Sequence, residues 1–452
     1  MKKTVSLLLC LAMIVSLAVN IFAKHPFTDV SDDKWYAEAV DYCYNNKLVN
    51  GTSDTEFSPM KSLTRAMFVL ILARAVDPTY EEYTEVSFSD VEEGSWYAEA
   101  VEWAYQNNIT KGTSETTFSP YAQINRQQVC ALFYNYIIEK GISHKFDESL
   151  LLEYTDAGDI AEWAKDGVIY AISNGIVSST SKESLIASPK MKVTRAQAVQ
   201  MFMTFNENLP KKYFTMSFDD GITQDIRIIE ILKKYNVDCC TFMVNTEGLY
   251  GADWGAAVSG MIGRPVDHLR FTEEQLRSGI YDGFDVQCHT RTHPSLKAYD
   301  DNLDMLINEV QGNANDLNSI FGHKPVGMAW PGGDNEYTER TIELVLENTD
   351  IRYARGIAST YTYKLPEKFM TWQPTCPVTD GNLLTYAQNF INAEPTEDML
   401  FYVWGHGYEL QGFDLYDEFE RMIKMISQRE DIILVTNTEF YELYKDEIPS
   451  WK

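Results

Sequence analysis

Residues 213–221 read Tyr-Phe-Thr-Met-Ser-Phe-Asp-Asp-Gly, an aromatic and β-branched run that leads directly into two adjacent carboxylates. Such a run predicts a β-strand that ends at the acids. Gly221 permits a turn there, so Asp219 and Asp220 can both face one cleft instead of opposite sides. Two adjacent acids are more often solvated loop residues, so the pair predicts a site only together with other residues.

Two later segments also follow stretches with strand character. Residues 284–288 alternate in hydrophobicity and lead to His289 and His293, and the apolar run 399–403 leads to His406. Because α/β folds place reactive groups at the ends of several strands, we expect these side chains to meet. The chain has only seven histidines, and three of them fall in these two segments.

Two imidazoles and one carboxylate make three protein ligands, which leaves a position open for water, as in catalytic metal sites. His289 and His293 lie on one side of the chain if their segment makes a single helical turn, although a pair of core or surface histidines is the alternative. A spare carboxylate can take the proton of the water, and His406 can protonate a departing amine or alkoxide. The set predicts metal-assisted hydrolysis of an acyl group.

After residue 213, expected helices alternate with short apolar strands. The helices cover 223–235 and 272–278, and the strands cover 240–244 and 284–288. Thr272 begins a capping box, which defines the start of one helix. This alternation predicts a parallel α/β barrel or an open sheet.

The first half of the chain carries a threefold repeat. Each unit opens on a Phe-Thr-Asp-Val-like motif and a tryptophan, passes through a helix, a turn and a Ser-Pro pair, and closes with a second helix. The tryptophans are Trp35, Trp96 and Trp163, and the closing helices begin at Thr64-Arg65, Asn125-Arg126 and Thr194-Arg195. Thr and Asn are natural N-caps. Each unit buries one apolar face, so the three should pack as one body.

Arg65, Arg126 and Arg195 occupy the first turn of a helix, where a cation opposes the helix dipole. We therefore predict an external anionic partner for them, with intramolecular salt bridges to nearby acids as the alternative. We interpret the tryptophans of the repeats as helix-packing anchors in preference to ligand platforms.

On these signatures, residues 27 to about 205 resemble three tandem S-layer homology modules. The resemblance implies a compact all-α body that anchors secreted proteins to anionic, typically pyruvylated, cell-wall polysaccharide. It also implies that Arg65, Arg126 and Arg195 contact that polymer in grooves between modules. The third module has Ser178-Ser179 where the others have Asn-Gly or Lys-Gly, so we expect a weaker groove there.

The motifs Ser-Phe-Asp-Asp-Gly, His-x-x-x-His-Pro and Trp-x-His, in this order, resemble the polysaccharide deacetylase family, carbohydrate esterase family four, over roughly residues 213–440. The resemblance implies a distorted (β/α) barrel with Asp219 as catalytic base and His406 as general acid. By the same resemblance the metal ligands are Asp220, His289 and His293. Zinc is the default ion for such a set, and cobalt, nickel or manganese fit similar ligands.

One motif departs from that family, because residues 328–333 read Met-Ala-Trp-Pro-Gly-Gly and lack the usual arginine that orients the base. We hypothesise that Arg355 takes its place beside Asp219 and lowers the pKa of that carboxyl. Trp330 and Trp404 either stack on a sugar ring or pack in the core. Two neighbours of His406, Tyr408 and Glu409, are placed to orient its imidazole.

Residues 1–23 combine two lysines, an apolar run and a small-residue cleavage site, which predicts a secretory signal peptide. A membrane anchor is the alternative, but the run is short for a spanning helix and no second such run follows. The formal charge of −28 argues against nucleic acid or an anionic membrane as partner. The cysteines after the leader lack the spacing of a disulfide framework and are predicted to be buried thiols.

The predicted organisation is a signal peptide (1–23), three modules (24–84, 85–148, 149–208) and a catalytic domain (209–452). We expect a secreted, cell-wall or S-layer associated, metal-dependent deacetylase that acts on an acetylated glycan. Amide substrates such as N-acetylglucosamine units are expected first and acetylated xylan second. The alternative is a wall-bound glycan-binding protein that keeps the fold without turnover.

Overall fold

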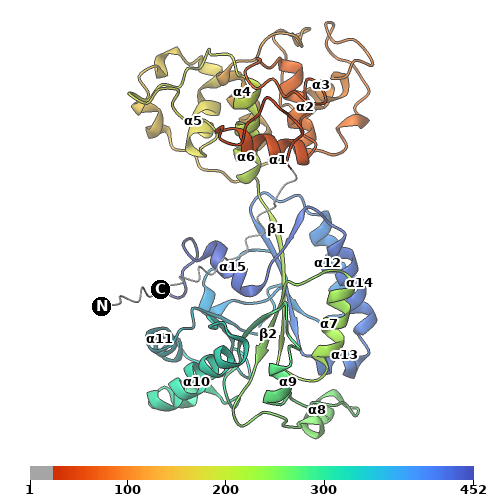
Figure 1. Ribbon diagram of the computed structural model, residues 1–452, viewed down its shortest axis with the longest axis vertical. Coiled ribbons are helices and arrows are strands. Elements are labelled where there is room, and N and C mark those ends of the chain that lie inside the picture. Colours follow the sequence, from red (N-terminus) through yellow and green to blue (C-terminus); the bar gives the residue numbers. More distant parts are fainter. Residues whose placement is uncertain (1–23) are drawn as a thin grey trace, which may run out of the picture. The chain divides into compact units, whose positions relative to one another are not determined.

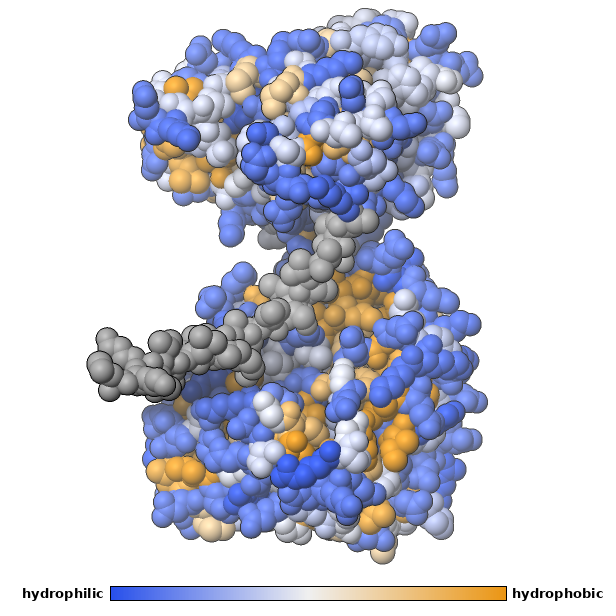
Figure 2. Space-filling view, viewed as in Figure 1, coloured by the Kyte–Doolittle hydropathy of each residue, from blue (hydrophilic) through white to orange (hydrophobic). Residues whose placement is uncertain are grey.

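The computed structural model describes residues 24–452, which form two compact units, one ending at Pro210 and the other covering Lys211–Lys452 (Figure 1). The predicted signal peptide lies outside the described residues. Within residues 24–452, no helix is both long enough and apolar enough to cross a membrane. Figure 2 shows a mostly hydrophilic face on the first unit and, on the second unit, hydrophilic residues interrupted by hydrophobic patches.

The first unit consists of three helix pairs with short 3-10 helices between them. The pairs are α1 (Ala37–Asn45) and α2 (Arg65–Val76), α3 (Ala98–Gln106) and α4 (Arg126–Glu139), and α5 (Lys165–Ser173) and α6 (Arg195–Glu207). The first helix of each pair packs against the closing helix of the preceding pair, and α1 packs against α6. The closing helices meet at Phe68, Phe133 and Phe202, whose ring centroids lie 4.8–5.2 Å apart. The three repeats therefore form one closed body, as predicted.

Backbone hydrogen bonds close the same ring. The amide of Leu63 donates to Val193, that of Val193 to Ile124, and that of Ile124 to Leu63, at 2.9–3.1 Å. Thr64, Asn125 and Thr194 are the N-caps of the closing helices, as the sequence predicts. The described residues of this unit are thus helical, with isolated β-bridges between modules as its only extended pairing.

Each module also repeats one strained turn. Ser58, Ser119 and Ser188 have positive φ angles of 57°, 60° and 48°, a conformation that costs a non-glycine residue free energy. An aspartate of the opening motif offsets this cost. In the second module, Asp90 accepts hydrogen bonds from the amides of Phe118 and Ser119 at 2.7 and 2.8 Å.

We expect Asp90→Ala to lower the free energy of unfolding of the helical unit by about 1 kcal/mol, because two charge-assisted bonds at a partly exposed turn are lost. Urea denaturation of the full chain measures this change. Asp90→Asn should lie between the alanine variant and the native chain. Asp54→Ala, on an exposed turn, should be neutral, and an equal loss in both alanine variants would contradict the role of Asp90.

The second unit is built on a parallel sheet. Its strands are β1 (Lys212–Asp219), β2 (Cys240–Val244), β3 (Asp285–Cys288), β4 (Gly327–Ala329), β5 (Tyr353–Arg355), β6 (Cys376–Pro377), β7 (Met399–Gly405) and β8 (Ile432–Leu434). The order is β5-β4-β3-β2-β1-β7-β6, with β8 beside the start of β1. Because no ladder joins β5 to β6 in the described residues, the sheet is an open half-barrel, which fits the predicted parallel α/β architecture.

The helices of this unit are α7 (Asp225–Lys234), α8 (Gly255–Ile262), α9 (Glu273–Arg277), α10 (Leu303–Phe321), α11 (Glu339–Asn348), α12 (Leu383–Asn392), α13 (Gly407–Phe413), α14 (Tyr416–Ser427) and α15 (Asn437–Tyr444). Helices α7, α10, α11, α12 and α14 cover the outer face of the sheet, whereas α15 packs against Tyr213 and Tyr402 on the inner face. Figure 1 shows α10 and α11 on one flank and α7, α12 and α14 on the other. The predicted capping box at Thr272 is present, and all six cysteines of the described residues are buried free thiols, as predicted.

β1 is buried along its whole length, and its residues alternate between two environments. Phe214, Met216 and Phe218 belong to the apolar core under the helices. Ser217 faces the inside, where its hydroxyl lies 2.9 Å from that of Tyr402. Asp219, two residues further along, lies on this inner face at the carboxyl end of the sheet.

Candidate active site

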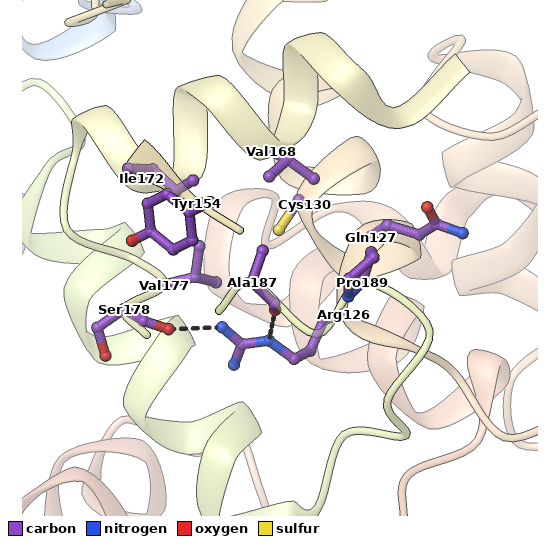
Figure 3. Close-up of a pocket in the computed structure, with 10 residues that line it drawn as sticks. All are labelled: Arg126, Gln127, Cys130, Tyr154, Val168, Ile172, Val177, Ser178, Ala187 and Pro189. Carbon is purple, nitrogen blue, oxygen red and sulfur yellow. Dashed lines mark hydrogen bonds between the residues drawn. The ribbon is translucent and has the colours of Figure 1, made fainter. Parts of the chain in front are cut away.

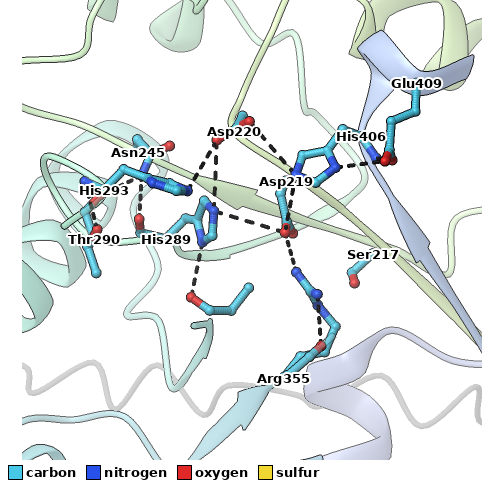
Figure 4. A network of polar contacts seen from close by, with 12 residues as sticks. Ser217, Asp219, Asp220, Asn245, His289, Thr290, His293, Arg355, His406 and Glu409 are labelled. Carbon is cyan, nitrogen blue, oxygen red and sulfur yellow. Dashed lines mark hydrogen bonds and ion pairs between the residues drawn. The ribbon is translucent and has the colours of Figure 1, made fainter. Parts of the chain in front are cut away.

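The three predicted segments converge at the carboxyl ends of β1, β3 and β7 (Figure 4). Asp219 pairs in register with Met243 of β2, and Phe218 pairs with Gly405 of β7. The ligand atoms of Asp220, His289 and His293 all lie within 4.8 Å of one another. The Nε2 atoms of His289 and His293 are 3.8 and 3.9 Å from Oδ1 of Asp220.

A left-handed turn brings the two aspartates together. Asp220 has a φ angle of 84° and Gly221 one of 62°. The turn rotates Asp220 out of the strand alternation, so that its carboxylate joins that of Asp219 instead of facing the opposite side. Gly221 predicted this turn. Asp220 also adopts a positive φ angle, which is strained for a residue other than glycine.

The two histidines do not lie on a helical turn, and that expectation was wrong. Residues 289–293 form a loop in which Thr290 and His293 have φ angles of 64° and 58°. The side-chain amide of Asn245 donates to the carbonyls of His289 and Thr290 and holds this loop at the end of β2. The rings therefore converge through tertiary contacts of the loop and not through helical periodicity.

The donor set fits a divalent cation. Nδ1 of His289 lies 3.0 Å from the carbonyl of Ala329, so Nδ1 donates its proton there and the Nε2 lone pair faces Asp220. Burial lowers the pKa of His289 to about 4 and also lowers that of His293, which keeps both imidazoles neutral as metal ligation requires. Asp220, His289 and His293 would hold the ion.

Arg355, at the end of β5, forms a buried ion pair with Asp219 through Nη2 and Oδ2. Burial opposes ionisation of Asp219, but the positive charges of Arg355 and His406 outweigh it and lower the pKa of this carboxyl. Oδ1 of Asp219 is buried without a hydrogen-bond partner. The sequence hypothesis predicted this contact. Arg355 lies on β5, whereas the motif at residues 328–333, which lacks the usual arginine, begins on β4.

His406, after β7, lies with Nε2 3.9 Å from Asp219 Oδ2 and 4.0 Å from Asp220 Oδ2. Its Nδ1 is 3.1 Å from Glu409, and the ring of Tyr408 stacks on it at 4.7 Å. Burial disfavours the imidazolium, but Glu409 and the two aspartates more than compensate and raise the pKa of His406 to about 9. Glu409 and Tyr408 thus contact the ring as the sequence allowed.

The two tryptophans near the motifs differ from each other. Trp330 is buried, stacks on Tyr337 and donates Nε1–H to the carbonyl of Met370, so it packs in the core. Trp404 is half-buried and lies under the guanidinium of Arg355 at 4.4 Å.

Sequence reasoning missed two residues that contact Asp220. His268 Nε2 lies 2.9 Å from Oδ2, and Arg270 Nη2 donates to Oδ1 at 2.8 Å. Burial opposes ionisation of Asp220, but these partners and the nearby imidazoles hold its pKa well below the usual range. Neither residue lies in a recognisable motif. The only signal was that His268 is one of seven histidines in an acidic chain.

The repeat arginines are buried at the junctions between modules. Arg65 donates Nε–H to Phe118, Arg126 to Ala187, and Arg195 to Phe57, each a backbone carbonyl of the next module around the ring. Arg126 also donates Nη2–H to the carbonyl of Ser178 (Figure 3). Arg195 donates Nη2–H to the carbonyl of Asn50 in the same way. Backbone carbonyl oxygens bind these cations, so the alternative of salt bridges to nearby acids is not seen for them among the described residues. The external anionic partner and the contact with a wall polymer stay predictions.

The repeat tryptophans are exposed, which corrects their interpretation as packing anchors. Trp35, Trp96 and Trp163 keep 60%, 50% and 62% of their surface open to solvent. Trp163 lines a groove of about 810 Å³ with Arg65 and Lys111, and Trp35 lines one of about 490 Å³ with Arg126, Ser178 and Ser179. Each groove is therefore formed by residues of all three modules.

Comparison with known proteins agrees with this division. The S-layer homology domain profile matches residues 26–67, 87–130 and 153–199, and the polysaccharide deacetylase profile matches residues 206–354. The chain is 30% identical over 172 residues to an exoglucanase of Acetivibrio thermocellus, which is 38% of this chain and 15% of the relative. It is 25% identical over 247 residues to a surface-layer 125 kDa protein of Lysinibacillus sphaericus, which is 52% of this chain and 20% of the relative.

Among solved structures, a family 4 acetyl xylan esterase from Clostridium thermocellum in complex with a cobalt ion is similar to this chain. The identity is 18%, the match covers 53% of this chain and 94% of that chain, and the TM-score is 0.33.

The chain therefore joins S-layer homology repeats to a second domain of another family. Its own domains are three S-layer homology repeats and a polysaccharide deacetylase domain, as the sequence predicted. The repeats indicate cell-wall or S-layer association. The exact domain limits stay predictions.

We expect Arg355→Ala to lower the free energy of unfolding by about 3 kcal/mol at neutral pH, because it leaves the Asp219 charge buried and unpaired. Urea denaturation measures the change. The double variant Arg355→Ala/Asp219→Asn should recover part of the loss, since the unpaired charge is then gone. No recovery would indicate that Arg355 acts through packing alone.

Proposed function

We propose that the chain is a wall-anchored, metal-dependent deacetylase that removes acetyl groups, N-acetyl groups first, from a cell-surface glycan. The convergence of Asp219, Asp220, His289, His293 and His406 at one edge of the sheet carries this proposal. A general base, a three-ligand cation site and a proton donor are the parts that acyl hydrolysis needs. Zinc is the first expectation for the ion, with cobalt, nickel or manganese as substitutes.

A divalent cation at such a site polarises the acyl carbonyl and acidifies water. In our proposal Asp219 is the general base. Its Oδ2 is held by Arg355, so the unpartnered Oδ1 is the atom that can accept the proton of the attacking water. Arg355 is a positioning residue that keeps this carboxylate oriented and ionised.

His406 is the proton donor in this proposal. Its Nδ1 is held by Glu409, which leaves the Nε2 proton free to move to the departing atom. Amide cleavage requires protonation of the leaving nitrogen, whereas an ester oxygen departs more readily. A well-oriented donor therefore supports N-acetyl substrates, such as N-acetylglucosamine units, ahead of acetylated xylan.

We further propose that the grooves of the helical unit bind an anionic cell-wall polysaccharide. Exposed tryptophans suit the faces of sugar rings, and Lys111 and Arg65 supply positive charge in an otherwise acidic chain. Anchoring raises the local concentration of the enzyme near its polymer, so even weak groove affinity helps turnover.

The purified chain, supplied with zinc, cobalt, nickel or manganese, should release acetate from N-acetylated chitin or peptidoglycan oligosaccharides. A chelator should abolish the release. Asp219→Asn should lower turnover at least 100-fold, because the base is lost, while Asp417→Asn, exposed at the start of α14, should be neutral. Acetate measured by a coupled assay reports each result.

Release from acetylated xylan alone would move the assignment to an ester substrate. A native chain that binds glycan but releases no acetate with any of these ions would instead support the binding-only alternative.

Trp163→Ala and Lys111→Ala should each weaken co-sedimentation with purified cell walls several-fold. The loss in Lys111→Ala should shrink at higher salt, because salt screens the Lys111 charge in the native chain as well. Trp35→Ala should have a smaller effect, because its groove carries Ser178 and Ser179 in place of Lys-Gly. Leu152→Ala, 86% exposed, is the control and should bind as the native chain does. Equal binding by all four variants would contradict the groove assignment.

A further inference from the structure

The segment that follows α8 is fastened beside Asp220 by backbone hydrogen bonds. The amide of Thr223 donates to Leu269, and that of Phe271 donates to Gly221, at 2.9 and 3.0 Å. These bonds place His268 and Arg270 against the turn that carries Asp220. Both side chains are almost fully buried, at 1% and 2% exposure, so their positions are determined by packing.

Each of the two side chains occupies one oxygen of the same carboxylate. His268 Nε2 lies 2.9 Å from Oδ2 of Asp220, and Arg270 Nη2 lies 2.8 Å from Oδ1. Oδ1 is also the oxygen nearest to the Nε2 atoms of His289 and His293. The oxygen that would bind a cation is therefore shared with a guanidinium.

Arg270 makes an incomplete contact with Asp220. An arginine beside a carboxylate often forms two parallel bonds, one to each oxygen. Among the described residues, only Nη2 bonds to Asp220, Nε donates to Asn245 Oδ1 at 3.4 Å, and Nη1 is buried with no hydrogen-bond partner. The guanidinium lies over the ring of Trp254 at 3.8 Å, so it is held close to the carboxylate. Oδ2, the oxygen that a second bond would need, lies 2.9 Å from His268 Nε2.

We propose that His268 is a positioning residue that prevents Arg270 from forming a second hydrogen bond to the carboxylate of Asp220. By holding Oδ2, it keeps Oδ1 turned toward His289 and His293 and able to bind a divalent cation. This inference rests on the proposed metal site at Asp220. It assigns to His268 a role that differs from ligation, since His268 contacts the ligand and not the ion.

The expected effect follows from the freed oxygen. In His268→Leu, Oδ2 loses its partner and the unpaired Nη1 of Arg270 can bind it. The guanidinium of Arg270 then binds both oxygens of Asp220. Affinity for a divalent ion should therefore fall about 10- to 100-fold, the range typical when a residue that supports a metal ligand is lost. His268→Gln keeps a donor near Oδ2 and should stay within a few-fold of the native affinity.

The test is a double-mutant cycle on metal affinity, measured by zinc titration of the full, metal-stripped chain against a competing chelator. Arg270→Gln alone should bind zinc at least as tightly as the native chain, because a positive charge beside the ion is removed. The double variant His268→Leu/Arg270→Gln should recover most of the affinity lost in His268→Leu. His323→Leu, a histidine bonded to the carbonyl of Val286 away from Asp220, is the matched control and should be unchanged.

A merely structural role for His268 predicts that the double variant binds no better than His268→Leu, and that result would overturn the inference. Native affinity in His268→Leu would overturn it as well. If the native chain itself binds no divalent ion, the proposed metal site fails instead. Thermal melting of each variant identifies any that fail to fold. If His268→Leu fails to fold, Arg270→Gln carries the comparison, and weaker zinc binding than in the native chain would overturn the inference.

Discussion

The second unit depends on one constraint, which is the burial of two adjacent carboxylates at the end of β1. Asp219 and Asp220 are 3% and 5% exposed, and isolated charges at that depth would be strongly unfavourable. Each carboxylate is paired with an arginine: Asp219 with Arg355 at the end of β5, and Asp220 with Arg270 in the segment after α8. The buried charges of the candidate site are therefore compatible with the fold because distant segments neutralise them.

The helical unit also buries charged side chains, but it stabilises them with a different kind of partner. Its repeat arginines are also buried, but their partners are backbone carbonyls of the next module in the ring. Each module thus completes its neighbour, and the same junctions form the grooves lined by exposed tryptophans. Stability and the proposed glycan binding come from one arrangement, since a groove exists only where modules meet.

Much of the fold and of the candidate site could be predicted because local patterns carried it. The aromatic run before Asp219 and the apolar run before His406 identified β1 and β7, and parallel strands end at the same edge of a sheet. The loop of His289 and His293 was misjudged, because its left-handed residues depend on Asn245 from another strand end. The exposed repeat tryptophans were misjudged as well, since local sequence does not reveal which module will cover a ring.

The sequence by itself determined the strand-to-acid transition, the repeat and its N-caps, and the set of carboxylates and imidazoles, because these depend on neighbours within a few residues. Only the tertiary structure decided which oxygen of each aspartate is occupied. Arg355, Arg270 and His268 reach the aspartates from strands and loops 48 to 136 residues away. Hydrogen bonds over such separations depend on how the sheet is assembled, and no local pattern encodes them.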